Sequence, residues 1–307
     1  MLSDRILEEI EKKDNPSVIG LDTRFEYLPD KMKREYLACY GETMKAAAEG
    51  ILCFNMALID SLYDMAAVVK VQSAFYEMYG PEGVRVFHGT CEYAAAKGMI
   101  VIADCKRNDI GSSAAAYSAA YLGETQVGGS RIRAFGPDCL TVNPYLGTDG
   151  LMPFIEDCNR YDKAIFILVK TSNPSSAEYQ DRLLKETGDT LYMDVATKIN
   201  GYIIKTGIHG YSNIGAVAGA TYPEAAARLR KLLSKSLLLV PGYGVQGADP
   251  GSIGSFFDKN GSGALINSSR AILLAYKELK TDDYAEASRA KAIAMRDDIN
   301  ATIKGAR

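Results

Sequence analysis

The sequence has few of the side chains that hold metal ions or form disulfide frameworks. Its only two histidines, His88 and His209, lie far apart and have no neighbouring ligand types, so we expect no metal site. Six cysteines are scattered through apolar or strand-like segments, without the close pairs typical of metal sites, at positions 39, 53, 91, 105, 139 and 158. This pattern indicates reduced, mostly buried thiols and favours a cytoplasmic protein.

The sequence also lacks a long hydrophobic run and an excess of basic charge. No apolar segment is long enough to cross a bilayer. The first residues predict an acidic amphipathic helix capped by Ser3 or Asp4 rather than a signal peptide. The net charge of -3 provides no basic surface for a nucleic-acid backbone. We therefore expect neither a membrane nor a nucleic acid as a partner.

The chain does contain the material for one large α/β domain. Hydrophobic residues make up 47% of its 307 residues, which permits a large core. Short apolar segments alternate with helical stretches and predict eight strands, at residues 17–21, 66–71, 99–103, 138–143, 164–169, 213–218, 237–240 and 264–267. This alternation predicts a (β/α)8 TIM barrel that forms a single domain over residues 1–307. Extra helical insertions are expected, including two helices over residues 30–65 that are separated near Gly50.

A cluster of charges follows the third predicted strand. Residues 101–111 have the sequence VIADCKRNDIG, which places Asp104, Lys106 and Asp109 at the spacing Asp-x-Lys-x-x-Asp. Alternation along a strand puts Asp104 and Lys106 on one side, and Asp109 lies beyond the strand end. A lysine between carboxylates can be positioned to deliver a proton. In isolation, the same motif would more often be a solvated loop with an incidental ion pair.

Other strands also end in polar residues, and in a barrel these ends share one mouth. Lys70 ends the apolar second strand, where an unpaired lysine is costly to bury, and Asp104 and Asp109 are its expected partners. Asp22 follows the first strand, where it could be only a cap or a turn residue. Ser172 lies after the fifth strand, in a hydroxyl-rich loop that is long enough to be a lid.

The last two strands end in features that suit a phosphate group. The loop at residues 242–247 exposes backbone N–H groups where side chains are missing, and Gln246 can donate from its amide. The eighth strand leads Ser268 and Ser269 to a helix N-terminus beside Arg270. Each glycine alone could mark only a turn. Barrels often bind phosphate after strands seven and eight, so the two features together favour a phosphate site.

These segments resemble the orotidine 5'-phosphate decarboxylase family, in the branch usually called type 2. The resemblance covers the barrel from about Val18 to Arg270. It is carried by ADCKRNDIG at residues 103–111, by Lys70, and by PGYGVQGADPG at residues 241–251. It implies a decarboxylase of de novo pyrimidine biosynthesis that converts orotidine 5'-phosphate to uridine 5'-phosphate (UMP) and carbon dioxide. The substrate would be a small phosphorylated pyrimidine nucleotide, and no cofactor or metal would be required.

The resemblance further implies four catalytic residues. Lys106 would protonate C6 of the pyrimidine as carbon dioxide leaves, and Asp104 would lie against the substrate carboxylate. Lys70 and Asp109 would complete an alternating charge array. In this family the second aspartate enters the partner's site, so the resemblance implies a homodimer with shared active sites, in which Asp109 acts in the neighbouring subunit.

Four substrate-binding residues are implied in the same way. Asp22 would bind ribose hydroxyls, and Ser172 would hydrogen-bond the amide edge of the pyrimidine. Gln246 and Arg270 would hold the 5'-phosphate. Two weaker family positions, near the ribose and across the dimer, could equally be packing residues: Gln72 and Ser113.

Two other functions are weighed against this one. A magnesium-dependent keto-gulonate 6-phosphate-type decarboxylase shares the Asp-x-Lys-x-x-Asp motif, but it carries an acid for the metal where this sequence has Lys70. A cation at that position would repel magnesium. A non-catalytic barrel that senses pyrimidine nucleotides would share the fold. Simple binding, however, would not require two lysines and two aspartates.

Overall fold

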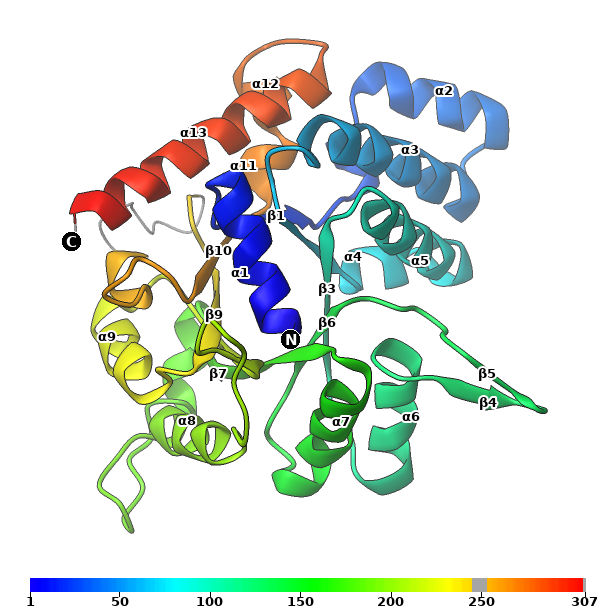
Figure 1. The fold of residues 1–307 in the computed structure, drawn as a ribbon. Coiled ribbons are helices and arrows are strands. Elements are labelled where there is room, and N and C mark those ends of the chain that lie inside the picture. Colours follow the sequence, from blue (N-terminus) through cyan, green and yellow to red (C-terminus); the bar gives the residue numbers. More distant parts are fainter. Residues whose placement is uncertain (245–252, 306–307) are drawn as a thin grey trace.

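Eight parallel strands form a closed barrel in the computed structural model, which describes residues 1–244 and 253–305 (Figure 1). The (β/α)8 prediction is confirmed, and neighbouring strands follow the order β1-β10-β9-β8-β7-β6-β3-β2. The barrel strands are β1 Ser17–Leu21, β2 Val68–Gln72, β3 Ile100–Arg107, β6 Cys139–Val142, β7 Ala164–Lys170, β8 Ser212–Ala218, β9 Ser236–Pro241 and β10 Ala264–Ser268. That the whole chain forms a single domain stays a prediction.

Helices surround the barrel, and a short antiparallel hairpin projects from its side (Figure 1). The helices are α1 Leu2–Lys13, α2 Asp30–Tyr40, α3 Met44–Leu62, α4 Ala74–Glu77, α5 Gly80–Ala96, α6 Gly111–Tyr121, α7 Thr148–Tyr161, α8 Leu191–Gly201, α9 Pro223–Leu232, α11 Arg270–Leu273, α12 Ala275–Glu278 and α13 Tyr284–Gly305. The hairpin strands are β4 Thr125–Val127 and β5 Ser130–Ile132, and three 3-10 turns are η1 Phe25–Tyr27, η2 Pro174–Glu178 and η3 Gly254–Phe256. In the described part of the chain, no helix has both the length and the apolar character needed to cross a membrane.

The expected break near Gly50 is wrong, because α3 continues through this residue. The two helices separate instead between Gly41, whose φ of 68° ends α2, and Thr43, whose hydroxyl accepts the N–H of Ala46 at 3.2 Å and caps α3. At Gly50 a Cβ would lie 2.8 Å from Leu28, so this glycine permits close packing. A glycine in a helix therefore marks a close contact here rather than an end.

Neither Ser3 nor Asp4 is the N-cap as expected, since α1 begins at Leu2 and its N-cap is Met1. Ser3 donates its hydroxyl to the carbonyl of Tyr211 at 2.9 Å, and Asp4 accepts the terminal amine at 2.9 Å. Ser3 Oγ thereby attaches α1 to the segment that leads into β8. A polar residue near a helix start can thus serve tertiary packing instead of capping.

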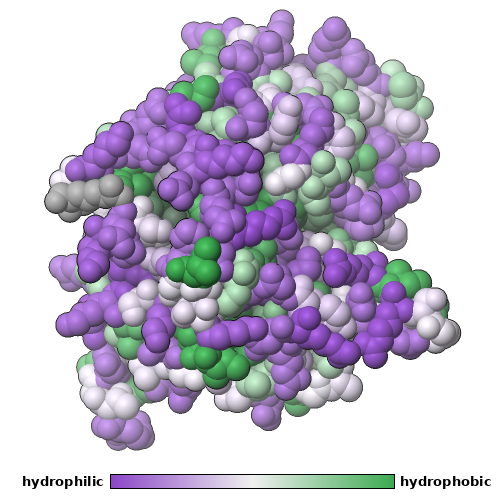
Figure 2. Space-filling view, viewed as in Figure 1, coloured by the Kyte–Doolittle hydropathy of each residue, from purple (hydrophilic) through white to green (hydrophobic). Residues whose placement is uncertain are grey.

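The apolar core consists of two layers, an inner layer that fills the barrel and an outer layer between the strands and the surrounding helices. Along β3, Ile100 and Ile102 belong to the inner layer, and Val101 and Ala103 belong to the outer one. Residues of α1 complete the inner layer, and α1 lies across the amino-terminal end of the barrel (Figure 1). The face that carries α1 is mostly hydrophilic, with small separate apolar patches (Figure 2). A site inside the barrel is therefore reached from the opposite end, at the carboxyl ends of the strands.

Candidate active site

A cavity of about 440 Å³ lies at the carboxyl ends of the strands. The polar residues that line it continue the inner face of each strand, because side chains alternate along a strand. Lys70 and Gln72 follow Val68 at spacings of two, Asp104 follows Ile102 in the same way, and both apolar residues belong to the inner layer. Six of the eight predicted site residues line this cavity: Asp22, Lys70, Asp104, Lys106, Ser172 and Arg270.

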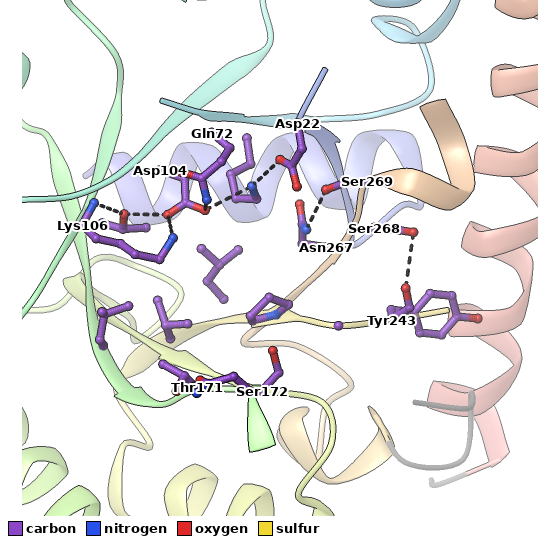
Figure 3. A pocket seen from close by; sticks show the side chains of 18 of the residues that line it. Asp22, Gln72, Asp104, Lys106, Thr171, Ser172, Tyr243, Asn267, Ser268 and Ser269 are labelled. Atoms are coloured by element: carbon purple, nitrogen blue, oxygen red, sulfur yellow. Dashed lines mark hydrogen bonds and ion pairs between the residues drawn. The ribbon is translucent and has the colours of Figure 1, made fainter. Parts of the chain in front are cut away.

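Four of these residues form a continuous array of alternating charge. Lys70 Nζ lies 2.9 Å from Asp22 Oδ1 and 3.1 Å from Asp104 Oδ2. Lys106 Nζ then lies 2.7 Å from Asp104 Oδ1. Figure 3 shows Asp22, Asp104 and Lys106 along one side of the cavity, with Thr171 and Ser172 across from them. Every charge in the array thus has a neighbour of opposite sign.

Burial makes these contacts strong. Lys70 is 3% exposed and Asp104 is 6% exposed, whereas the side chain of Lys106 is 45% exposed. Burial by itself lowers the pKa of Lys70, but Asp22 and Asp104 outweigh it and keep this pKa above its ordinary value. Burial likewise raises the pKa of Asp104, but Lys70 and Lys106 outweigh it and hold this pKa at about 2. Lys70 and Asp104 are therefore both charged at neutral pH.

A bulge at the end of β3 directs Lys106 toward Asp104. The strand extends to Arg107, beyond the predicted end at residue 103. Its register with β6 shifts between Ala103 and Arg107, and Lys106 adopts a φ of 49°. Simple alternation predicted the side correctly, but the left-handed backbone at Lys106 could not be predicted from it, because non-glycine residues rarely adopt this conformation.

The other end of the cavity carries hydroxyl and guanidinium groups. Ser268, Ser269 and Arg270 line it together with Gly242 and Tyr243. Figure 3 shows Ser268 and Tyr243 on the opposite side from Lys106. The Arg270 side chain makes no ion pair within residues 1–244 and 253–305, so its charge is open to an anion. Gln246, the remaining predicted phosphate ligand, lies outside the described residues.

Asp109 does not pair with Lys70 in its own chain, so that expectation is wrong. The second acid at Lys70 is Asp22, from β1's carboxyl end. Asp109 is only half-buried, does not line the cavity, and accepts the N–H of Ile110 at 2.8 Å. The reason is that the chain leaves the barrel after β3, whereas neighbouring β1 brings Asp22 alongside Lys70.

The two weaker positions differ from each other. Gln72 lines the cavity and donates to Asp104 Oδ2 at 2.9 Å, so it supports the array. Ser113 is exposed in α6 and does not line the cavity. The hydrogen bond of Gln72 to Asp104 is a role that the sequence did not indicate.

Two further cavity residues were missed by the sequence analysis. Thr141 of β6 is 1% exposed, and its hydroxyl bonds both Asp104 and the backbone of Lys106. Asn267 of β10 is 5% exposed, and its Nδ2 donates to Ser269 Oγ at 3.4 Å. The signal that pointed to Lys70, a polar residue on the inner side of an apolar strand, was present at both positions.

The described residues contain no group of three or more His, Cys, Asp or Glu side chains arranged to hold a metal ion. All six cysteines are free; Cys39 and Cys53 are exposed, and the rest are buried, at positions 91, 105, 139 and 158. The prediction of mostly buried thiols is thus confirmed.

Comparison with known proteins adds to this geometry. A family model described as orotidine 5'-phosphate decarboxylase / HUMPS family matches residues 43–281. Proteins named orotidine 5'-phosphate decarboxylase include one from Caldicellulosiruptor saccharolyticus, 44% identical over 98% of both chains, and one from Rhodopirellula baltica, 40% identical over 92% of this chain and 93% of the other. The solved OMP decarboxylase of Leishmania donovani aligns with a TM-score of 0.73, 28% identity and 98% coverage of both chains. The chain belongs to the orotidine 5'-phosphate decarboxylase / HUMPS family.

Proposed function

We propose that this protein decarboxylates orotidine 5'-phosphate to UMP and carbon dioxide, as a step of pyrimidine biosynthesis. The observation that carries the proposal is the array of Asp22, Lys70, Asp104 and Lys106, in which each contact is 3.1 Å or shorter. It occupies one end of a cavity whose other end presents Arg270, which forms no ion pair with the residues that the structure describes. The names of the relatives agree with this substrate.

Lys106 is the proton donor in this proposal. Loss of carbon dioxide from C6 leaves an electron pair in the plane of the ring, where the ring π system cannot delocalise it. A fixed ammonium group stabilises that pair as it develops. The ammonium then transfers a proton to C6, which forms the C6–H bond of UMP and leaves a neutral amine that regains a proton from solvent. The half-exposed side chain of Lys106 reaches the cavity from the array.

Asp104 acts on the carboxylate that leaves. Its pKa of about 2 keeps it ionised at neutral pH. A substrate carboxylate beside it is repelled, and the repulsion disappears as this group becomes neutral carbon dioxide. The binding energy of the distant phosphate group can hold the substrate there despite the repulsion. The role of Asp104 therefore requires that the cavity bind the phosphate of the nucleotide at its other end.

The remaining residues bind the phosphate, ribose and pyrimidine groups of the substrate in this proposal. Arg270 and Gln246 hold the 5'-phosphate, Asp22 binds the ribose hydroxyls, and Ser172 hydrogen-bonds the pyrimidine amide. The lining positions of Asp22, Ser172 and Arg270 support this assignment. Gln246 lies outside the described residues, and its assignment follows from the amide donor that the glycine loop carries in the sequence and from the family resemblance.

The reaction proceeds without a cofactor in this proposal. Among the described residues, the carboxylates that line the cavity are Asp22 and Asp104, and the ammonium of Lys70 lies between them. A second cation there would be repelled by it. A second observation disfavours a barrel that only binds nucleotides. The ammonium of Lys106 lies against Asp104, and binding of a phosphate at the opposite end of the cavity would not need this ammonium.

The proposal includes a cytoplasmic homodimer. Ile110 follows Asp109 in the chain and is 56% exposed, and the loop after β6 carries two further exposed apolar side chains, Tyr145 at 81% and Leu146 at 47%. Leu146 lies close to Asp109, because a Cβ built on Gly150 would lie 3.0 Å from the Asp109 carbonyl oxygen and 3.3 Å from Leu146 Cβ. Exposed apolar residues in one area are typical of an interaction surface. A second copy of the chain placed there would bury them and receive Asp109 near its own cavity. The free cysteines support a reducing compartment.

The function is tested with the purified protein and orotidine 5'-phosphate. We expect loss of the substrate's ultraviolet absorbance and formation of UMP, with the same rate after treatment with EDTA. An activity that EDTA abolishes and magnesium restores would favour the keto-gulonate phosphate type of reaction. Binding of the nucleotide without turnover would favour a sensor.

A further inference from the structure

We infer that Thr141 is a positioning residue that couples the bulge of β3 to the Asp104 carboxylate and thereby holds Lys106 in place. The inference rests on the proposed function, because it concerns the proton donor of that reaction. Thr141 belongs to β6, and its side chain is almost completely buried at the floor of the cavity. Two hydrogen bonds of its hydroxyl group, and a third between Lys106 and Asp104, support the inference.

The hydroxyl of Thr141 has a fixed orientation. Its oxygen accepts the backbone N–H of Lys106 at 3.0 Å and lies 2.8 Å from Asp104 Oδ1. A hydroxyl has one hydrogen, and an ionised carboxylate can only accept. The hydrogen of Thr141 is therefore donated to Asp104, while a lone pair of the same oxygen receives the Lys106 N–H.

The bulge of β3 needs such an acceptor. Ala103 pairs with Leu140, and Arg107 pairs with Val142, so the residues between them on β3 face only Thr141 on β6. The bulged residue loses its place in the ladder of backbone hydrogen bonds. Lys106, in the left-handed region with a φ of 49°, recovers a partner for its N–H through the side chain of Thr141. The side chain thus replaces a backbone carbonyl.

The same hydroxyl closes a ring of hydrogen bonds. From Lys106 N the ring passes to Thr141 Oγ1, then to Asp104 Oδ1, and returns to Lys106 Nζ at 2.7 Å. Both ends of Lys106 are therefore tied to one carboxylate. A lysine has several rotatable bonds, and holding it in one position costs side-chain entropy. The ring holds the ammonium in place before substrate binds, which favours proton transfer to a defined atom.

The test compares Thr141→Val, which keeps the shape and removes the hydroxyl, with Thr141→Ser, which keeps the hydroxyl. We expect Thr141→Val to lower kcat by about 10- to 100-fold, the range of one lost hydrogen bond to a charged group. The KM and the affinity for UMP should stay within about threefold, because the interaction acts mainly in the transition state. Thr141→Ser should recover most of kcat.

A matched control is Thr90→Val, since Thr90 is equally buried, accepts from Asn55 at 3.2 Å and does not line the cavity. It should lower the melting temperature without lowering kcat. An equal loss of kcat in the valine variants of Thr141 and Thr90, or a kcat of Thr141→Val within about threefold of wild type, would overturn the inference.

Failure of the proposed function is recognised separately, because wild-type protein would then leave orotidine 5'-phosphate unchanged. In that case a crystal structure of Thr141→Val still decides the positioning role. The inference requires that Lys106 leave its left-handed conformation or that its contact with Asp104 open. If the backbone and the contact stay as they are in the wild type, Thr141 does not position Lys106.

Discussion

Replacement of Lys70 by methionine separates the charge of this residue from its bulk. Methionine keeps a long unbranched stem in the same buried place but removes the ammonium that lies 2.9 Å from Asp22 and 3.1 Å from Asp104. The two carboxylates would then face each other without the cation between them. Asp104 would retain Lys106 and Gln72 as hydrogen-bond donors, so the variant would lose only part of the contacts in the array.

The loss of stability can be worked out from burial. Breaking a buried ion pair by removing one partner costs about 3 to 5 kcal/mol, and the retained donors at Asp104 favour the lower figure. An entropy of unfolding of about 2.1 cal/mol/K per residue makes each kcal/mol worth about 1.6 °C in this chain of 307 residues. We therefore expect the melting temperature of Lys70→Met to fall by about 5 °C at neutral pH.

The loss of stability in Lys70→Met should also depend on pH in a defined direction. Burial raises the pKa of Asp104, and Lys70 and Lys106 lower it to about 2 from an ordinary 3.8. This depression contributes about 2 kcal/mol of stability that is present above pH 4 and is lost as the pH falls through about 2. Without Lys70 the pKa of Asp104 rises and the contribution shrinks. The difference in melting temperature between wild type and variant should therefore narrow from pH 5 to about pH 2.

In Lys70→Met the increase in the activation free energy of the reaction should exceed the loss in the free energy of unfolding. A unit charge at about 4 Å in a medium of effective dielectric constant near 20 contributes about 4 kcal/mol, which corresponds to roughly a thousandfold in rate. The assay is kcat/KM with orotidine 5'-phosphate, beside melting curves as a function of pH. Lys163→Met is the matched control, because Lys163 is also buried, at 6% exposure, and its partners, the carbonyl of Pro137 and Asp138 at 3.8 Å, lie outside the cavity.

Two results would refute the reasoning about Lys70. One is a Lys70→Met enzyme that keeps more than about a tenth of wild-type kcat/KM, since the charge would then contribute little to the reaction. The other is a loss of stability in Lys70→Met that stays constant down to pH 2. A constant loss would mean that Lys70 does not control the ionisation of Asp104.

Three further predictions concern the other functional groups. Lys106→Ala should lose nearly all turnover and still bind UMP in a calorimetric titration, because the amine acts on charge that develops during the reaction; a variant that keeps more than about a tenth of wild-type kcat would exclude it as proton donor. Arg270→Ala should lower kcat/KM for orotidine 5'-phosphate by about 10- to 100-fold but hardly change it for orotidine, which has no phosphate. Equal losses for both would assign Arg270 to the fold. Mixing inactive Lys106→Ala and Asp109→Ala subunits under exchange should restore activity, since each heterodimer would contain one intact site; a mixture that stays inactive would place Asp109 in its own subunit's site.

The sequence by itself determined the barrel and the side on which its polar residues lie. Eight apolar segments separated by helices leave few arrangements other than a closed parallel barrel. Alternation within a strand is a local property, so the inward positions of Lys70 and Asp104 followed from their spacing to apolar neighbours alone. The family motif around Lys106 was likewise visible in the linear sequence.

The tertiary structure decided which polar groups meet. Asp22 rather than Asp109 pairs with Lys70, because contacts across a barrel depend on the register between strands that are remote in sequence. The bulge that directs Lys106 and the hydroxyl of Thr141 that accepts its N–H have the same origin, in the register shift between β3 and β6. Local pattern fixes the face on which a side chain lies in a regular strand, whereas contacts between strands, and the bulge at Lys106, depend on the neighbouring strand.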